Sequence, residues 1–203
     1  MCYYYFFLKE LNKRIAVFCA SSRKTQELYL TEAYNLGAEI ARRGDVLVFG
    51  AGSTGLMGSL SDGALAAGGK VIGIIPSFMM ELEWGRNDLY RLEITNSMEE
   101  RKERMIDGSD AIVVLPGGNG TMDEFYQVLT MKRLGQYLNP IVVVNVNGFY
   151  DSWVEFMQHT VRENFMSEEH MTMFTVVNSP GEVYDAINNS PTWDTDSINR
   201  ARL

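Results

Sequence analysis

The sequence has very few cysteines and histidines, and this excludes two classes of small protein. Its 203 residues include two cysteines, Cys2 and Cys19, which is too few for a disulfide framework. They also include two histidines, His159 and His170, so the ligand cluster that a zinc site requires is missing. We therefore expect no metal, and a protein of the reducing cytoplasm.

Basic residues and long apolar runs are scarce as well. Lys and Arg number 18 against 26 Asp and Glu, and the formal net charge of −8 argues against an extended nucleic-acid-binding surface. The apolar run at residues 3–8 is too short to cross a membrane, and Lys9 and Glu10 follow it at once. No other run approaches the roughly eighteen apolar residues that a membrane helix needs. We expect neither a nucleic acid nor a membrane as a partner.

The sequence does contain a regular alternation of strand and helix signals. A hydrophobic content of 46% is enough for a full core. Short, uniformly apolar segments are typical of strands buried on both faces, and segments with apolar residues at helical spacing lie between them. Strands are expected at 15–19, 46–49, 71–75, 92–95, 112–115, 141–145 and 174–177. Helices are expected at 26–43, 56–67, 97–107, 121–134, 149–163 and 180–188.

This alternation predicts one doubly wound, Rossmann-like α/β domain, a three-layer sandwich around a parallel sheet of about seven strands. The domain is expected to span residues 13–189. Residues 1–12 are interpreted as an N-terminal extension that packs on the surface or at a subunit contact. Residues 77–89 are expected to be irregular, and residues 190–203 to form a polar, loose tail.

In such a sheet, ligands bind beyond the carboxyl ends of the strands. The loops expected to share one crevice are 20–22, 50–58, 96–102 and 116–124.

The loop at 116–124 predicts a phosphate site. Pro116-Gly117-Gly118 ends a buried strand, and Thr121 opens the helix that follows. Glycines at 117, 118 and 120 allow positive φ and a close approach to a ligand. Free N–H groups at a helix N-terminus favour an anion, and the Thr121 hydroxyl adds a further hydrogen bond.

The segment 50–55, GAGSTG, matches the G-x-G-x-x-G pattern of dinucleotide sites. However, it follows the second strand instead of the first, and Ile74-Ile75-Pro76 occupies the place where an acidic residue should bind the ribose. A dinucleotide site is therefore disfavoured. The remaining interpretations are glycines that serve a tight turn and close helix packing, and glycines that shape a nucleotide pocket.

Three charged residues have both a structural and a functional interpretation. Arg101 and Lys102 share the inward, apolar face of their helix, so they either snorkel at the edge of the core or bind an anionic ligand. Glu124 either completes a T-x-x-E capping box with Thr121 or acts beside the phosphate loop, where a carboxylate orients water or stabilises a cationic transition state.

Together these motifs resemble the Lonely Guy (LOG) family of cytokinin riboside 5′-monophosphate phosphoribohydrolases. Residues 116–124, PGGNGTMDE, match the family's P-G-G-x-G-T-x-x-E signature, and Glu100-Arg101-Lys102 matches its E-R-K element. The resemblance runs from about Ile15 to Val183. Its further motifs are CASS at 19–22, GAG at 50–52, GLMG at 55–58 and NVNGFYD at 145–151.

The resemblance implies a homodimeric hydrolase that cleaves the N-glycosidic bond of an adenine-type nucleoside 5′-monophosphate without cofactor or metal. It implies that Arg101 and Glu124 are the catalytic pair. The substrate contacts that it implies are Ser21, Glu83, Lys102, Gly117, Gly118, Asn119, Gly120 and Thr121. Two alternatives use the same loops, namely an AMP nucleosidase and a non-catalytic nucleotide-binding or sensor protein. An amino-acid decarboxylase is disfavoured, because no lysine stands in a recognisable pyridoxal-phosphate motif.

The chain departs from the family pattern around the expected base site. It reads Met131-Lys132-Arg133 where many members have W-A-Q. A preference for prenylated adenine over plain AMP requires an apolar pocket, and the alternative role of the candidate side chains is loop and core packing. These candidates are Met79, Met80, Leu82, Trp84 and Met131.

Overall fold

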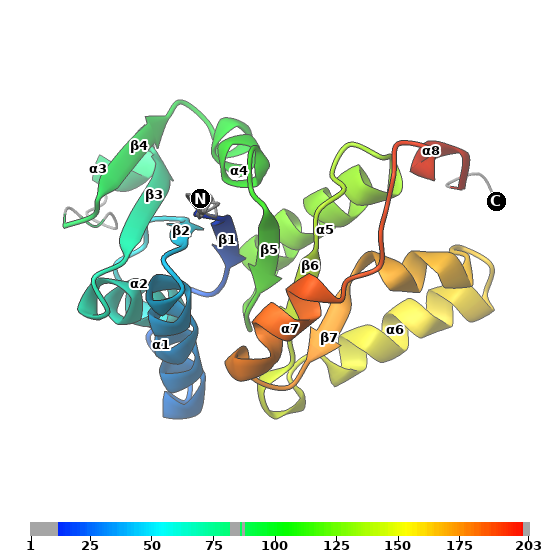
Figure 1. Cartoon of the computed structure of the whole chain (residues 1–203), viewed down its shortest axis with the longest axis horizontal. Helices are drawn as coiled ribbons and strands as arrows, with labels where there is room; N and C mark the ends of the chain where they lie inside the picture. Colours follow the sequence, from blue (N-terminus) through cyan, green and yellow to red (C-terminus); the bar gives the residue numbers. More distant parts are fainter. Residues whose placement is uncertain (1–11, 82–85, 87, 201–203) are drawn as a thin grey trace, which may run out of the picture.

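The computed structural model describes residues 12–81, 86 and 88–200, and these form the predicted α/β fold. Seven parallel strands make one sheet in the order β4-β3-β2-β1-β5-β6-β7, which Figure 1 shows from β4 at one edge to β7 at the other. The strands are β1 (Arg14–Phe18), β2 (Val46–Phe49), β3 (Lys70–Pro76), β4 (Arg91–Thr95), β5 (Ala111–Val114), β6 (Ile141–Val144) and β7 (Thr175–Val177).

The central strands are uniformly apolar because both of their faces are buried. All four side chains of β5, which reads AIVV, are buried. Successive side chains point to opposite faces, so Ile15 and Val17 of β1 join one core cluster and Ala16 and Phe18 join the other. A strand between two helical layers has no polar face, and this explains the near-continuous apolar runs in the sequence.

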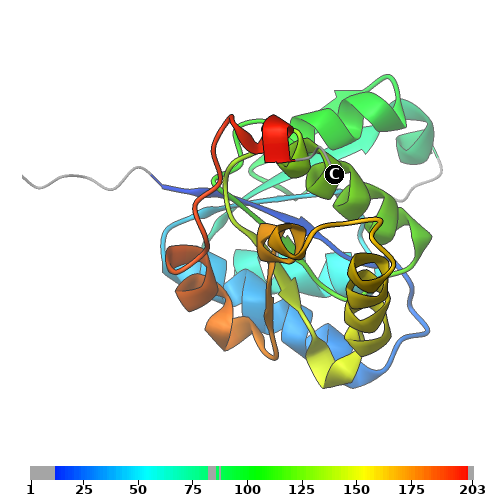
Figure 2. The ribbon, with the colours of Figure 1, turned by 90° about the vertical axis from the view of Figure 1, so that its right-hand side faces the viewer.

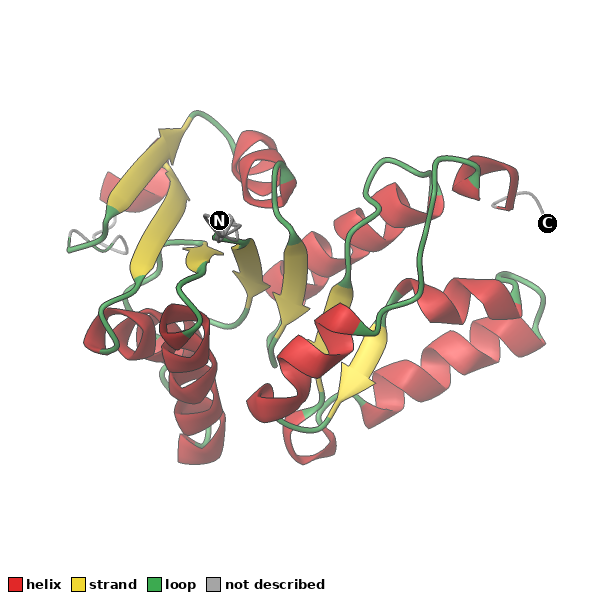
Figure 3. Cartoon of the chain, viewed as in Figure 1, coloured by secondary structure: helices red, strands yellow, loops and turns green. Residues whose placement is uncertain are grey.

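Helices cover both faces of the sheet, as Figures 2 and 3 show. One face is covered by α1 (Glu27–Arg42), α2 (Gly55–Ala66) and α7 (Val183–Asn188). The other is covered by α4 (Met98–Ile106), α5 (Asn119–Arg133) and α6 (Asp151–Arg162). The shorter helical elements are α3 (Ser77–Glu81), α8 (Ser197–Arg200), η1 (Val146–Gly148), η2 (Glu168–Met173) and η3 (Pro180–Glu182).

The order of the strands reverses at β1, which pairs with β2 on one side and with β5 on the other. The loops that follow β1 and β5 therefore diverge to opposite faces and leave a crevice between them. The two loops also meet at their bases, where the Ala20 N–H donates to the Pro116 carbonyl oxygen at 3.3 Å. This is the edge of the sheet at which the sequence predicts the ligand.

Among the differences between the predicted and the observed elements, three concern residues 76–81 and the start of α5. Residues 77–81, expected to be irregular, form α3, which is too short to show a helical period in the sequence. β3 continues through Pro76, whose missing N–H is tolerated at the last position of the strand. α5 begins at Asn119, two residues earlier than expected, and this changes the interpretation of Thr121 and Glu124 below.

The prediction of a loose tail is wrong for residues 190–200. Trp193 is buried, and its Nε1 donates to the Thr172 carbonyl oxygen at 3.3 Å. The backbone of Thr195 lies against Gly135, just beyond the end of α5. One large apolar side chain therefore anchors a segment whose composition is otherwise polar.

Apart from Asn12, the expected N-terminal extension lies outside the described residues. Among the helices that the structure does describe, none is both long enough and apolar enough to cross a membrane. Within the same residues, no three His, Cys, Asp or Glu side chains group as ligands of a metal ion.

Two glycines allow α1 and α2 to cross closely. A Cβ on Gly37 would lie 1.9 Å from the Leu60 carbonyl oxygen, and a Cβ on Gly63 would lie 2.0 Å from the Tyr34 carbonyl oxygen. Backbone on backbone contact of this kind cannot be relieved by turning a side chain. The crossing therefore depends on the absence of a Cβ at both positions.

We predict that Gly37→Ala destabilises the fold, because the clash with Leu60 outweighs the better helix propensity of alanine. The free energy of unfolding, measured in urea, should fall by about 1–3 kcal/mol. Gly181→Ala is the control, since the nearest atom to its Cβ would be the Ser179 Oγ at 3.8 Å. The control should change stability by less than about 0.5 kcal/mol. Equal stabilities for the two variants would contradict the close crossing.

Candidate functional site

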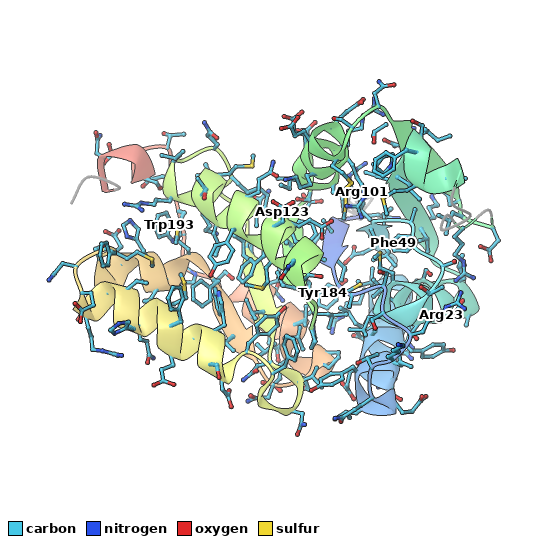
Figure 4. All side chains as sticks on the ribbon, turned by 180° about the vertical axis from the view of Figure 1, so that it is seen from behind. Arg23, Phe49, Arg101, Asp123, Tyr184 and Trp193 are labelled. Atoms are coloured by element: carbon cyan, nitrogen blue, oxygen red, sulfur yellow. The ribbon has the colours of Figure 1, made fainter. Side chains whose placement is uncertain are left out.

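A buried ion pair joins two helices at the carboxyl edge of the sheet. Arg101 lies in α4 and Glu124 in the second turn of α5, and they are only 4% and 6% exposed. The Arg101 Nη1 donates to the Glu124 Oε1 at 2.6 Å. Figure 4 labels Arg101 beside α4 and Asp123, the neighbour of Glu124, on α5. The inward orientation predicted for Arg101 from helical spacing is confirmed.

The other guanidinium nitrogens of Arg101 bind backbone carbonyl groups of the sheet edge. The Nε donates to Ile74 of β3 at 3.1 Å, and the Nη2 donates to Gly50, just after β2, at 3.4 Å. A buried cation is stable only when hydrogen bonds and an opposite charge replace its water. Arg101 therefore spans the ends of β3 and β2 and meets the helix that follows β5.

The contact between Gly50 and Arg101 explains one of the glycines in the GAGSTG segment. A Cβ at this position would lie 1.8 Å from the Arg101 Nη2, so a side chain would displace the guanidinium. Gly55 has φ +61° and touches the backbone of Ser21 and Ser22, which requires glycine for a different reason. The segment thus combines the two remaining interpretations, a tightly packed turn and the wall of a pocket.

The N-terminal cap of α4 fixes the direction of Arg101. The Ser97 Oγ accepts from the Glu100 N–H at 3.1 Å, and the Glu100 Oε2 accepts from the Asn96 N–H at 2.8 Å. These bonds pin the first turn of the helix, one residue before Arg101. The sequence analysis missed this cap, although the S-x-x-E pattern at 97–100 is a visible signal for it.

The capping-box interpretation of Glu124 is wrong. The N-cap of α5 is Gly118, so Thr121 already lies inside the helix and does not cap it. Glu124 consequently stands one full turn too deep to reach the cap, and its carboxylate binds Arg101 instead. The T-x-x-E letters are the same in both cases; the start of the helix decides between them.

Burial raises the pKa of Glu124, and the neighbouring Arg101 opposes this shift. Burial also raises the pKa of Cys19, and the negative charge of Glu124 raises it further, so the thiol keeps its proton. The site therefore holds a desolvated carboxylate with one oxygen fixed by a guanidinium. Such a group acts strongly on positive charge that develops nearby.

The phosphate loop, residues 116–121, passes from β5 into the first turn of α5. The N–H groups of this first turn have no acceptor within the helix, and the helix dipole adds to their attraction for an anion. Gly118, Asn119 and Gly120 are exposed, and Thr121 is buried. The loop therefore leads into a helix N-terminus whose first residues are exposed, which is the geometry that anion sites use.

Positive φ, which the sequence led us to expect, does not explain the glycines of the loop. Gly117, Gly118 and Gly120 do not take positive φ. A Cβ on Gly117 would lie 2.1 Å from the Thr121 Oγ1. At Gly118 and Gly120, a Cβ would meet no described atom within 4 Å beyond the adjoining residues and the nearby backbone of the helix, so tertiary packing does not explain the missing side chains. The space above these two glycines is what a ligand would use.

Lys102 forms a second link between α4 and α5. Its Nζ donates to both carboxylate oxygens of Asp123, at 3.1 and 2.9 Å. Lys102 follows Arg101 in α4, and Asp123 precedes Glu124 in α5, so the two ion pairs are neighbours. The Asp123 carboxylate is exposed. Because water screens the exposed Asp123 carboxylate, the ion pair holds the largely buried Lys102 side chain only weakly.

A cavity of about 280 Å³ opens beyond the ends of β1, β2 and β3. Ser21, one of the expected substrate contacts, lines it, and Gly50 is shared with the Arg101 contact. Its full lining is Ser21, Arg23, Gly50, Gly52, Ser53, Thr54, Met57, Ile75 and Met79. Met57 and Ile75 could not be predicted as lining residues from the sequence, because apolar side chains of these types are usually core residues.

Several expected base-site residues are not part of this cavity. Glu83, Leu82 and Trp84 lie outside the described residues. Met131 and Lys132 both lie away from this cavity, and the packing of Met131 against the core agrees with the alternative that the sequence left open. Met131 lines a separate cavity with Tyr137. The Lys132 Nζ donates to the Asn139 carbonyl oxygen at 2.6 Å, just before β6 begins. A helix of the length of α5 spans about 22 Å, and its C-terminal end lies at the opposite edge of the sheet.

Comparison with known proteins supports the resemblance to the LOG family that the motifs indicate. The family model described as "Possible lysine decarboxylase" matches residues 57–187. The Oryza sativa subsp. japonica protein named "Cytokinin riboside 5'-monophosphate phosphoribohydrolase LOG" is 38% identical over 157 residues, which cover 77% of this chain and 65% of that protein. The Arabidopsis thaliana protein of the same name, LOG1, is 39% identical over 155 residues, which cover 76% of this chain and 73% of that protein.

Solved structures share the fold at lower sequence identity. The molybdenum cofactor carrier protein of Chlamydomonas reinhardtii superposes with a TM-score of 0.68 at 22% identity, over 88% of this chain and 97% of that one. This match shows the fold alone. The sequence relatives are similar enough, over enough of both chains, to show the family. The chain belongs to the LOG family of cytokinin riboside 5′-monophosphate phosphoribohydrolases.

Proposed function

We propose that this protein hydrolyses the N-glycosidic bond of adenine-type nucleoside 5′-monophosphates, cytokinin nucleotides included, and releases the free base and ribose 5-phosphate. The observation that carries the proposal is the buried Arg101–Glu124 pair, which lies between the phosphate loop and the cavity. The relatives of the chain are named for this reaction.

The order of the strands orients the substrate in the crevice. The phosphate loop follows β5, and the cavity lies beyond β1, β2 and β3 on the other side. Arg101 touches the ends of β3 and β2 and binds Glu124 of the helix after β5, so the pair bridges the two regions. Under this proposal, a nucleotide with its 5′-phosphate on the loop and its base in the cavity would have its C1′ near Glu124.

The phosphate loop supplies the binding energy that holds this geometry. Backbone N–H groups from the first turn of α5 would bind the phosphate oxygens at the positive end of the helix dipole. The open space at Gly118 and Gly120 admits the phosphate, and Lys102 adds a cation at the rim. Binding a remote, non-reacting group in this way positions the reacting bond.

The chemical step breaks the bond between C1′ and N9. The electron pair of this bond leaves with the base, which takes up a proton, and the oxygen of a water molecule forms the new bond to C1′. Positive charge develops on the ribose as the bond breaks, as in glycoside hydrolysis. The Glu124 carboxylate stabilises this charge and orients the water, and its burial strengthens both effects.

The contacts of Arg101 support a role in positioning Glu124. Each of its guanidinium nitrogens has an internal partner, namely Glu124, Ile74 or Gly50. These contacts hold the buried guanidinium against the sheet edge and Glu124, and Nη1 and Nη2 each keep a second N–H. We assign Arg101 the task of holding one Glu124 oxygen, which leaves the second oxygen for water and substrate.

The cavity wall favours an adenine with an apolar substituent. Met57, Ile75 and Met79 present apolar surface, and the hydroxyl groups of Ser21 and Ser53 offer hydrogen bonds to the ring edge. Methionine side chains adapt to ligands of irregular shape. Prenylated adenine fits this combination better than a pyrimidine does.

A homodimer is the proposed assembly. The outer surface of α5 and α6 carries an apolar groove of about 270 Å³, in which Phe165 is 73% exposed, Phe156 54% and Tyr126 40%. Contiguous exposed apolar surface of this kind marks an interaction site. Association of two chains through this groove would remove these rings from water.

We also propose a cytoplasmic location. Cys19 is a free, buried thiol, which fits a reducing compartment.

The first test of the proposal is a substrate panel. AMP, isopentenyladenosine monophosphate, GMP and CMP are incubated with the protein, and free base is measured by chromatography. We expect base from both adenine nucleotides, with kcat/KM about tenfold higher for the prenylated one because a buried methylene group alone is worth about 1–3 kcal/mol.

Each other result of the panel has a distinct meaning. Base from AMP alone would identify an AMP nucleosidase. No base from any of the four would identify a non-catalytic binding protein. Lysine is added as a separate substrate, and release of carbon dioxide from it would support a decarboxylase instead.

The second test is Glu124→Gln, which keeps the shape of the side chain and removes its charge. We expect kcat to fall by about 10² or more, with nucleotide affinity largely kept, since the group acts on the transition state. Glu99→Gln, an exposed carboxylate of α4, is the control and should retain the parent rate. A Glu124→Gln rate within about threefold of the parent would exclude the catalytic role.

The third test addresses the assembly. Analytical ultracentrifugation at micromolar concentration should give twice the chain mass of 23.0 kDa. Phe156→Glu should yield monomers, because a charge in an apolar interface costs several kcal/mol. Tyr90→Glu, at an exposed aromatic residue beside β4, should remain dimeric. A monomeric parent, or monomers from both variants, would contradict an interface in the groove.

A further inference from the structure

A buried tyrosine outside the crevice is bonded to the backbone that leads into the phosphate loop. Tyr150 lies immediately before α6 and is fully buried, and its hydroxyl donates to the Leu115 carbonyl oxygen at 2.8 Å. Leu115 is the residue between the end of β5 and Pro116. The tyrosine thus reaches from the segment after β6 to the start of the phosphate loop.

The base of the loop has three hydrogen bonds where the sheet ends. The Leu115 N–H donates to Phe18 of β1 at 2.9 Å, and the Ala20 N–H donates to the Pro116 carbonyl oxygen at 3.3 Å. Pro116 has no N–H of its own. The Tyr150 hydroxyl is the side-chain donor of this set and holds the peptide plane between Leu115 and Pro116. The loop beyond it is exposed at Gly118–Gly120, so its direction depends on this base.

Tyr150 is itself held firmly. Its N–H donates to the Asn145 Oδ1 at 2.6 Å, and the Asn145 Nδ2 donates to the Asp151 Oδ1 at 2.7 Å. Asn147 and Gly148 have φ of 53° and 71°, which turns the chain back over the end of β5. Asparagine and glycine are the residues that tolerate this conformation. The NVNGFYD motif thus places the hydroxyl, a role that the sequence analysis left without an explanation.

Burial raises the pKa of the Tyr150 hydroxyl, which favours the protonated form that donates to Leu115. Its ring is packed edge to face against Phe149 and Trp153, with centroid distances of 5.0 and 6.1 Å. Both the position and the protonation state of the donor are therefore fixed.

We propose that Tyr150 is a positioning residue for phosphate binding, which acts by holding the Leu115 carbonyl and thereby setting the direction of the N–H groups of the phosphate loop. The inference rests on the proposed function, since it takes the loop to bind the 5′-phosphate. Tyr150 does not touch the substrate; its effect is transmitted through the Leu115–Pro116 backbone.

Tyr150→Phe tests the inference, because it keeps the ring and removes the hydroxyl. The matched control is Tyr184→Phe. Tyr184 is also buried, and its hydroxyl donates to the Asp45 Oδ2 at 2.7 Å, just before β2 and therefore at the opposite edge of the sheet. Figure 4 labels Tyr184. Both variants lose one buried hydrogen bond, so both should show a lowered Tm.

Phosphate affinity separates the two variants. We expect Tyr150→Phe to raise the Kd for ribose 5-phosphate, measured by calorimetry, and the KM for AMP by about tenfold, with kcat changed less than about threefold. Tyr184→Phe should stay within about twofold of the parent in all three quantities. Asn145→Ala, which releases the Tyr150 backbone, should weaken ribose 5-phosphate binding by about threefold or more.

Equal Kd values for Tyr150→Phe and Tyr184→Phe would overturn the inference, because Tyr150 would then be structural only. A loss confined to kcat would overturn it as well. A parent protein that binds ribose 5-phosphate and releases no base would refute the proposed hydrolysis alone, and the comparison of Kd values would still decide the role of Tyr150. A parent that does not bind ribose 5-phosphate would refute the inference, since there would be no phosphate to position.

Discussion

The buried ion pair between Arg101 and Glu124 is the interaction on which the rest of the site depends. Two charges removed from water are tolerated only when every polar atom finds a partner, and loss of either one leaves an uncompensated charge in the interior. The partners come from separate parts of the chain, since Arg101 binds Ile74, Gly50 and Glu124. The pair therefore forms only when β2, β3, α4 and α5 are all in place.

Because neighbouring strands differ in length, the sheet leaves backbone carbonyl groups unpaired at its edge, and Arg101 binds them. β2 ends at Phe49, which pairs with Gly73, so β3 continues beyond its neighbour. The Ile74 carbonyl oxygen consequently has no strand partner on that side and accepts from Arg101. Within a ladder, every such oxygen is occupied. The crevice of an open parallel sheet is therefore rich in unpaired backbone groups, which suits it to hold both a charged side chain and a polar ligand.

Much of the fold could be predicted from the sequence, because strands buried on both faces and helices with one apolar face leave strong periodic signals. The inward Arg101 follows from the same periodicity. Contacts between distant residues leave no such signal. Nothing local distinguishes a Glu124 that caps its own helix from one that binds Arg101, and nothing near Tyr150 indicates that its hydroxyl bonds to Leu115. The error at Trp193 has a related cause, since composition does not reveal which single ring anchors a polar segment.

The place of β1 at the centre of the sheet also governs how the chain reaches its native state. β1 pairs with β5, and the Arg14 N–H that donates to the Asp110 carboxylate joins residues 96 positions apart. Long-range parallel pairings of this kind give slow folding, because the entropy of closing a large loop is lost before any stabilising contact forms. During synthesis the edge of β1 that will receive β5 stays open until β5 has left the ribosome, and an open apolar edge invites pairing with another chain. A ribosome that stalls before β5 thus leaves a nascent chain with both an unfinished crevice and an aggregation-prone edge.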